Sequence, residues 1–138
     1  YNKAVNYSDI LPAKTEFLRT PTRYGYAAIN YSPALKLNLS INLVHTGAME
    51  LLHLAGSPVQ TVDEYKTTEV FNVIGLKAAY IQDLKKIGVG FEYSVGIKNL
   101  SNSYQSNFDS GKNRDSNFVY GPSTPRLIYC GLALKSLK

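Results

Sequence analysis

The fold of this chain is decided by one stretch, IGVGFEYSVGIK, which covers residues 87–98 of the 138. Large apolar side chains alternate there with small, polar or charged ones, and this period of two predicts a β-strand. In a soluble sheet the second face would meet bulk water, where larger polar side chains fit as well as glycine, so the glycines at positions 88, 90 and 96 would be unexplained. Bulky residues on one face and tiny or charged residues on the other instead fit the wall of a membrane β-barrel, where lipid contacts one face and a filled lumen the other.

The composition favours β structure and excludes some functions. The chain has 11 tyrosines and no tryptophan, and tyrosine suits both sheets and the membrane–water boundary. Cys130 is the only cysteine, so it forms no disulfide within the chain and is expected to be a small apolar strand residue. The net charge of +5 includes no basic run, which argues against nucleic acid as a partner. Part of this charge comes from lysines near expected strand ends and turns: Lys85, Lys86, Lys135 and Lys138.

The pattern predicts an all-β fold, an antiparallel up-and-down meander of about five long strands. The expected strands are Tyr24–Tyr31, Lys36–His45, Val70–Ile81, Ile87–Lys98 and Arg126–Leu134. Short turns at Ser32–Ala34 and around Asp83–Lys86 join the first two strands and the third to the fourth. Residues 1–22 are expected to be loop with a short strand, and residues 46–69 and 100–125 to be long connections. No apolar run approaches the roughly 20 residues of a transmembrane helix.

The connections alternate short and long, which is the asymmetry of outer-membrane barrels with tight periplasmic turns and extended external loops. The turns near Pro33 and Lys85 would then be periplasmic, and the loops 1–22, 46–69 and 100–125 external. Strands of about 10 residues, tilted by roughly 45°, cover an apolar band of about 25 Å. Because a barrel of this type needs at least about 8 strands, five strands predict an arc of a larger transmembrane barrel.

The alternation also assigns faces. The residues expected to face lipid are Leu37, Leu39, Ile41, Leu43, Val89, Phe91, Tyr93 and Val95. The residues expected to face the lumen are Lys77, Glu92 and Lys98. Lys77 and Glu92 lie on adjacent inward faces, where they can pair with each other.

Several motifs resemble one family. The run Gly96-Ile97-Lys98-Asn99-Leu100, followed by Asn102 and Tyr104, resembles the G-x-x-N-L-F-N/D-x-x-Y segment near the end of TonB-dependent outer-membrane receptors. Segments similar to the last external loop and final strand of such receptors follow at 109–115, Tyr120-Gly121-Pro122 and Pro125-Arg126. Segments similar to an earlier strand precede it at Arg19-Thr20-Pro21, Tyr24-Gly25-Tyr26 and Asn30-Tyr31-Ser32-Pro33. Ser101 departs from the family, which usually has Phe there.

The resemblance implies that residues 1–138 are the carboxyl-terminal part of a receptor barrel of about 22 strands, with residues 23–138 supplying strands and their loops and with the plug domain absent. Such receptors lie in the outer membrane of a Gram-negative-type envelope and import a scarce ligand, such as a ferric siderophore or cobalamin. The implied partners are outer-membrane lipid, the plug and remaining barrel, and the TonB complex acting through the plug, with no cofactor. The inward glycines would let the plug backbone approach closely.

Ligand contacts are expected from loop residues with polar groups: His53, Arg114, Asp115 and Tyr120. The alternative is that these side chains fix the loop's own fold, with Arg114 in a local salt link to Asp109 or Asp115.

Other functions fit less well. His45 and His53 lie too far apart for one helical metal motif, and no nucleophile elbow or phosphate loop occurs, so the chain is not expected to be an enzyme. The main rival is a soluble carrier of a hydrophobic ligand, of the lipocalin or fatty-acid-binding type. That fold needs about eight legible strands and reverses the faces, so that the apolar side lines a cavity. A β-sandwich module would need more strands at closer spacing.

Overall fold

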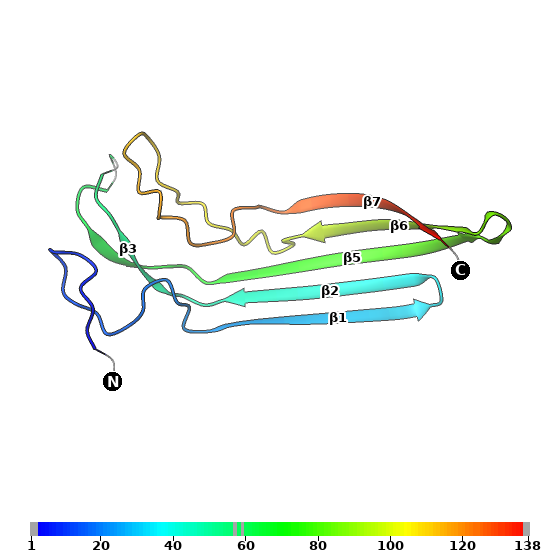
Figure 1. Cartoon of the computed structure of the whole chain (residues 1–138), viewed down its shortest axis with the longest axis horizontal. Helices are drawn as coiled ribbons and strands as arrows, with labels where there is room; N and C mark the ends of the chain where they lie inside the picture. Colours follow the sequence, from blue (N-terminus) through cyan, green and yellow to red (C-terminus); the bar gives the residue numbers. More distant parts are fainter. Residues whose placement is uncertain (1–2, 57, 59, 137–138) are drawn as a thin grey trace. The chain divides into compact units, whose positions relative to one another are not determined.

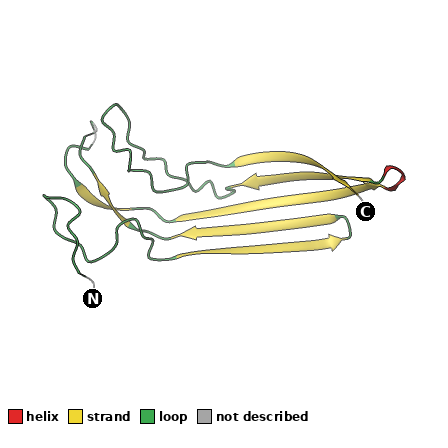
Figure 2. Ribbon diagram, in the orientation of Figure 1, coloured by secondary structure: helices red, strands yellow, loops and turns green. Residues whose placement is uncertain are grey.

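The computed structural model describes residues 3–56, 58 and 60–136, and it is all-β. Its strands are β1 (Tyr24–Ala34), β2 (Leu37–Thr46), β3 (Glu50–His53), β4 (Glu64–Thr67), β5 (Phe71–Leu84), β6 (Val89–Lys98) and β7 (Leu127–Ser136). One short 3-10 helix, η1 (Lys85–Ile87), lies between β5 and β6 (Figures 1 and 2). The described part of the chain contains no helix long and apolar enough to cross a membrane.

The chain divides into two compact units, which are described separately. The sheet unit consists of Gly25–His45, Asn72–Ser103 and Thr124–Lys138. The loop unit consists of Tyr1–Tyr24, Thr46–Phe71 and Tyr104–Ser123.

The sheet unit is built on one five-stranded sheet in the order β1-β2-β5-β6-β7 (Figure 1). β6 pairs with both neighbours in antiparallel register, so that Tyr93 lies opposite Tyr80 on β5 and opposite Leu132 on β7. β2 and β5 are joined by the backbone bond from Ile81 N to Lys36 O, 2.8 Å. The prediction of five long antiparallel strands is therefore confirmed. The sheet is open, and its place in a larger barrel stays a prediction.

The first short turn lies later in the chain than expected. β1 continues through Pro33 to Ala34, and the turn is made by Leu35 and Lys36. The expected turn at Ser32–Ala34 was therefore wrong. Proline is tolerated here because β1 is an edge strand, where a backbone N–H need not join a ladder.

The second short turn also differs in detail. β5 continues to Leu84, and the 3-10 helix closes on Gly88, whose φ of 66° is a left-handed conformation that favours glycine. Ile87 and Gly88 therefore belong to the turn, and the expectation that β6 begins at Ile87 was wrong. Within the period-two stretch, only the residues from Val89 onward form the strand.

The loop unit contains regular structure that the sequence pattern did not reveal. β3 and β4 pair in antiparallel register, with Glu50 opposite Thr67 and His53 opposite Glu64. They lie inside the 46–69 connection, which was expected to be irregular. Within residues 1–22, expected to be loop with a short strand, Val5 and Lys14 form an isolated bridge. The buried apolar side chains of this unit are Met49, Leu51, Phe71 and Phe118.

Candidate functional site

One face of the five-stranded sheet is apolar, and we call it the apolar face. Residues opposite each other on neighbouring strands share a face, so the pairs of β6 with β7 place Phe91 beside Leu134, Tyr93 beside Leu132 and Val95 beside Cys130. Side chains from β1, β2 and β5 continue this face, because one groove is lined by residues of all these strands, including Ile29, Tyr31, Leu39, Ile41, Leu76, Ala78, Val95 and Ile97. By strand alternation, all eight residues expected to face lipid lie on the apolar face.

The apolar face is exposed. Leu132 and Leu134 on β7 are 67% and 68% exposed, and Tyr93 on the inner strand β6 is still 46% exposed. A soluble sheet normally buries such a face against a second layer. Within the described residues, these side chains of the apolar face are not covered by a second layer.

The opposite face, which we call the polar face, carries paired charges. Lys77 Nζ lies 3.5 Å from Glu92 Oε1, and Lys135 Nζ contacts the other oxygen of Glu92. Lys77 and Glu92 are the pair that the sequence suggested, and Lys98 lies on the same face. Lys135 was missed, because the register that brings β7 beside β6 is not legible in the sequence.

Glycines on the polar face make room for side chains of adjacent strands. A Cβ on Gly96 would lie 2.5 Å from the Tyr129 ring, and one on Gly75 would lie 2.2 Å from Asn42 Oδ1. The ring of Tyr129 also lies 5.6 Å from Lys98 Nζ, within reach of a cation–π contact. Packing within the sheet therefore explains these glycines. Close approach of a plug backbone stays a prediction.

The receptor-like motif at the end of β6 has a local structural role. Asn99 is 4% exposed with a φ of 51°, and its side-chain amide donates to Ser103 O and Thr124 O at 3.1 and 2.8 Å. Asn102 Oδ1 accepts a hydrogen bond from Arg126 N at 3.0 Å. These bonds join the exit of β6 to the entry of β7.

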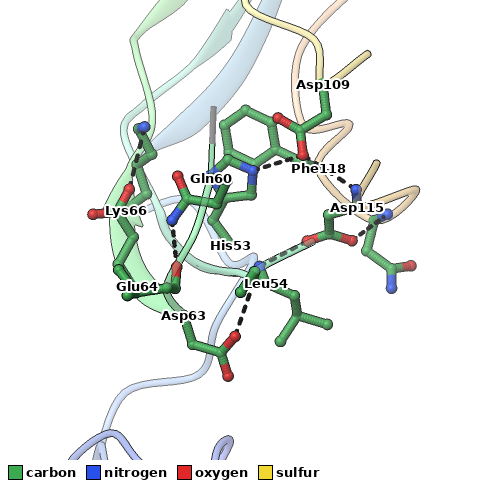
Figure 3. Close-up of polar contacts among 12 residues, drawn as sticks. His53, Leu54, Gln60, Asp63, Glu64, Lys66, Asp109, Asp115 and Phe118 are labelled. Atoms are coloured by element: carbon green, nitrogen blue, oxygen red, sulfur yellow. Dashed lines mark hydrogen bonds and ion pairs between the residues drawn. The ribbon is translucent and has the colours of Figure 1, made fainter. Parts of the chain in front are cut away.

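The loop unit is organised around a buried histidine–carboxylate pair (Figure 3). His53 Nε2 lies 2.9 Å from Asp109 Oδ2, and the two side chains are 3% and 4% exposed. The His53 ring stacks on Phe118, with centroids 3.7 Å apart. Burial raises the pKa of Asp109, but the bonds from His53 and from the backbone N–H of Asp115 outweigh it, so the pKa lies below its ordinary 3.8.

The other predicted ligand residues have different surroundings. Asp115 is buried and accepts backbone bonds from Leu54 N and Asn117 N at 3.0 and 2.8 Å (Figure 3). Tyr120 is half-buried, and its hydroxyl donates to Asn107 Oδ1 at 2.8 Å.

Arg114 is exposed. Among the described residues it forms no ion pair, and Asp109 is paired with His53, so the structure does not form the local salt link that was the alternative to ligand contact by Arg114. His53 and Asp115 thus serve the fold of the loop unit. Ligand contact by any of the four residues stays a prediction.

Two organising residues of the loop unit were missed. Gln105 is fully buried; its Nε2 donates to Phe118 O at 3.0 Å, and its Oε1 accepts from Tyr120 N and Gly121 N at 2.8 and 3.1 Å. The Arg19 guanidinium donates to the carbonyls of Asn117 and Val119. No spacing in the sequence marks either residue, because their partners are backbone atoms distant along the chain.

Among residues 3–56, 58 and 60–136, no three His, Cys, Asp or Glu side chains are grouped as a metal site would require. Comparison of the chain with models of protein families, with curated proteins and with solved structures finds no match.

Proposed function

We propose that this chain forms part of the wall of a transmembrane β-barrel in the outer membrane, as the carboxyl-terminal part of a TonB-dependent receptor. The observation that carries the proposal is the contrast between the two faces of the sheet. The apolar face is exposed across the strands, and the polar face has paired charges and interlocked small residues. Lipid on one side and a filled lumen on the other satisfy both faces.

The strand lengths support the same assignment. The shortest strands of the sheet, β2, β6 and β7, have 10 residues each. At ~3.3 Å per residue and a tilt of about 45°, such a strand covers roughly 23 Å, close to the apolar band of about 25 Å in these barrels. The unpaired edges of β1 and β7 would be joined to further strands of the same barrel, since exposed edges invite aggregation.

Within this proposal the chain supplies wall and external loops for energy-coupled uptake of a scarce ligand, such as a ferric siderophore or cobalamin. The long connections leave the strand ends opposite the two short turns, as the external loops of a barrel do. The plug domain, the rest of the barrel and the TonB complex would be the partners. The support for this narrower assignment is the resemblance of the segments around Asn99 and Arg126 to the family.

Lipid contact can be tested at the single native cysteine. Cys130 lies on the apolar face, opposite Val95, and Ala133 lies on the polar face, opposite Glu92. The wild-type sequence and the variant C130A/A133C would each be labelled with a fluorophore within the barrel closed by its remaining strands, with any other cysteines replaced, in phospholipid vesicles that contain brominated lipid. We expect strong quenching at position 130 and at most weak quenching at position 133.

Equal quenching at the two positions would contradict the proposal, because lipid would then not distinguish the faces. A chain that stays a soluble, cooperatively unfolding monomer without detergent would also contradict it, and would favour the soluble carrier. The two positions lie three residues apart on one strand, which at a tilt of about 45° is a difference in depth of about 7 Å, so lipids brominated at more than one depth are used to separate depth from face.

A further inference from the structure

The two short turns of the sheet unit enclose a hollow, which we call the turn-end hollow. Its volume is about 470 Å³, and it is lined by Lys36, Asp83, Leu84, Lys85, Lys86 and Ile87. Lys36 comes from the β1–β2 turn, and the others come from the end of β5 and from η1. The backbone bond from Ile81 N to Lys36 O holds the two turns side by side.

The turn-end hollow has an excess of positive charge. Three lysines line it and only one carboxylate, Asp83, which pairs with Lys36 at 3.4 Å. Among the described residues, no carboxylate lies within ion-pair distance of Lys85 or Lys86. Two ammonium groups on adjacent residues are therefore available to an anion.

The same hollow exposes aliphatic side chains. Ile87 is 67% exposed and Leu84 is 37% exposed, and both line it together with the lysines. Leu35, in the adjoining β1–β2 turn, is completely exposed. A free inorganic anion gains nothing from such surface, whereas an amphiphile presents an anionic group and apolar chains within a few ångströms of each other.

We propose that the turn-end hollow binds the headgroup of an anionic phospholipid, with Lys85 and Lys86 contacting its phosphate and Ile87 contacting the start of its acyl chains. The inference rests on the proposed membrane wall, because a transmembrane strand ends at the level of the headgroups. Basic side chains at that level attract anionic lipid, and each lysine near the surface adds to the binding free energy.

The experiment uses the full chain in detergent micelles, titrated with phosphatidylglycerol or phosphatidylcholine and followed by native mass spectrometry. The variant K85Q/K86Q removes both free ammonium groups. The control K3Q/K112Q makes the same charge change at exposed residues of the loop unit. We expect the wild-type chain and the control to prefer phosphatidylglycerol, and K85Q/K86Q to bind it roughly 10- to 30-fold more weakly at low salt.

Three results would overturn the inference. The first is an equal affinity of the wild-type chain for the two lipids, and the second is an equal loss in the control and in K85Q/K86Q. The third is displacement of phosphatidylglycerol by millimolar inorganic phosphate, which would identify a site for the free anion. If Cys130 is quenched by lipid while any of these results is obtained, only the lipid site fails; if Cys130 is not quenched, the membrane wall fails first.

Discussion

Replacement of Leu132 by arginine is the sharpest perturbation of the apolar face. Leu132 lies in the middle of β7 (Leu127–Ser136), opposite Tyr93, and is 67% exposed. If this position meets the centre of a bilayer, arginine there costs about 2–4 kcal/mol. Such a cost corresponds to a loss of roughly 30- to 900-fold in the equilibrium constant for folding into the membrane. If the position meets water, an exposed substitution changes stability by less than about 0.5 kcal/mol.

The measurement is a urea titration of the closed barrel that contains this chain, folded into phospholipid vesicles, with the folded fraction followed by circular dichroism. The control is Ala133→Arg, one residue further along the same strand. Ala133 lies on the polar face opposite Glu92, so an arginine there meets a carboxylate and avoids lipid. We expect Leu132→Arg to lower the free energy of unfolding by about 2–4 kcal/mol, and Ala133→Arg to lower it by less than about 1 kcal/mol.

The pair of variants separates membrane insertion from a general intolerance of β7 to arginine. Equal destabilisation by both would mean that the strand, rather than one face, rejects the charge. A wild-type-like Leu132→Arg would refute the reasoning outright, because an apolar face in lipid cannot accept a central arginine without cost.

Three further predictions concern packing and titration. Gly96→Ala should destabilise the sheet by about 1–3 kcal/mol in the same titration, because the added Cβ would lie 2.7 Å from the backbone oxygen of Leu76. Gly131→Ala should cost less, because its Cβ would meet only the Ser94 hydroxyl, which can rotate away. The folded pKa of Asp109 is below 3.8, so the ionised carboxylate stabilises the loop unit fully above that pH. This stabilisation is lost as the pH falls through the folded pKa, and limited proteolysis of the loop unit should therefore accelerate in acid. The variant Asp109→Asn should abolish that acceleration. Gln105→Ala should cost at least about 2 kcal/mol and speed hydrogen exchange at the Tyr120 amide, since it leaves buried backbone groups unpaired; unchanged exchange would contradict the role assigned to Gln105.

The long strands could be predicted because their signal is local. A period of two sustained over about ten residues predicts both a strand and the division of its side chains between two faces. β3 and β4, by contrast, have four residues each, too few for a period to emerge. The first turn was misplaced by two or three residues because Pro33 marks a turn in most settings but is also allowed on an edge strand. The second was misplaced because the period of two continues through Ile87 and Gly88, which belong to the turn.

The candidate site was predictable only where partners lie on neighbouring strands of a short hairpin. Lys77 and Glu92 lie on the same face of the neighbouring strands β5 and β6, four residues apart in register, and strand alternation alone places them on that face. His53 and Asp109 are 56 residues apart in the sequence, and no local pattern links them. Gln105 is a neutral residue in a loop rich in Ser and Asn, and its role comes from its burial and from its hydrogen bonds to distant backbone groups, neither of which a local pattern shows.

The side chains of the polar face explain how the sheet keeps its form without a second layer in the described part of the chain. Tyr129 lies over Gly96, and Ser94 lies against Gly131, so large and small side chains interlock between β6 and β7. Glu92 on β6 forms ion pairs with Lys77 on β5 and with Lys135 on β7. Cross-strand packing of this kind adds to the backbone ladder. Because these contacts use only the polar face, the apolar face is left free, and in the proposed barrel wall it contacts the hydrocarbon of the bilayer.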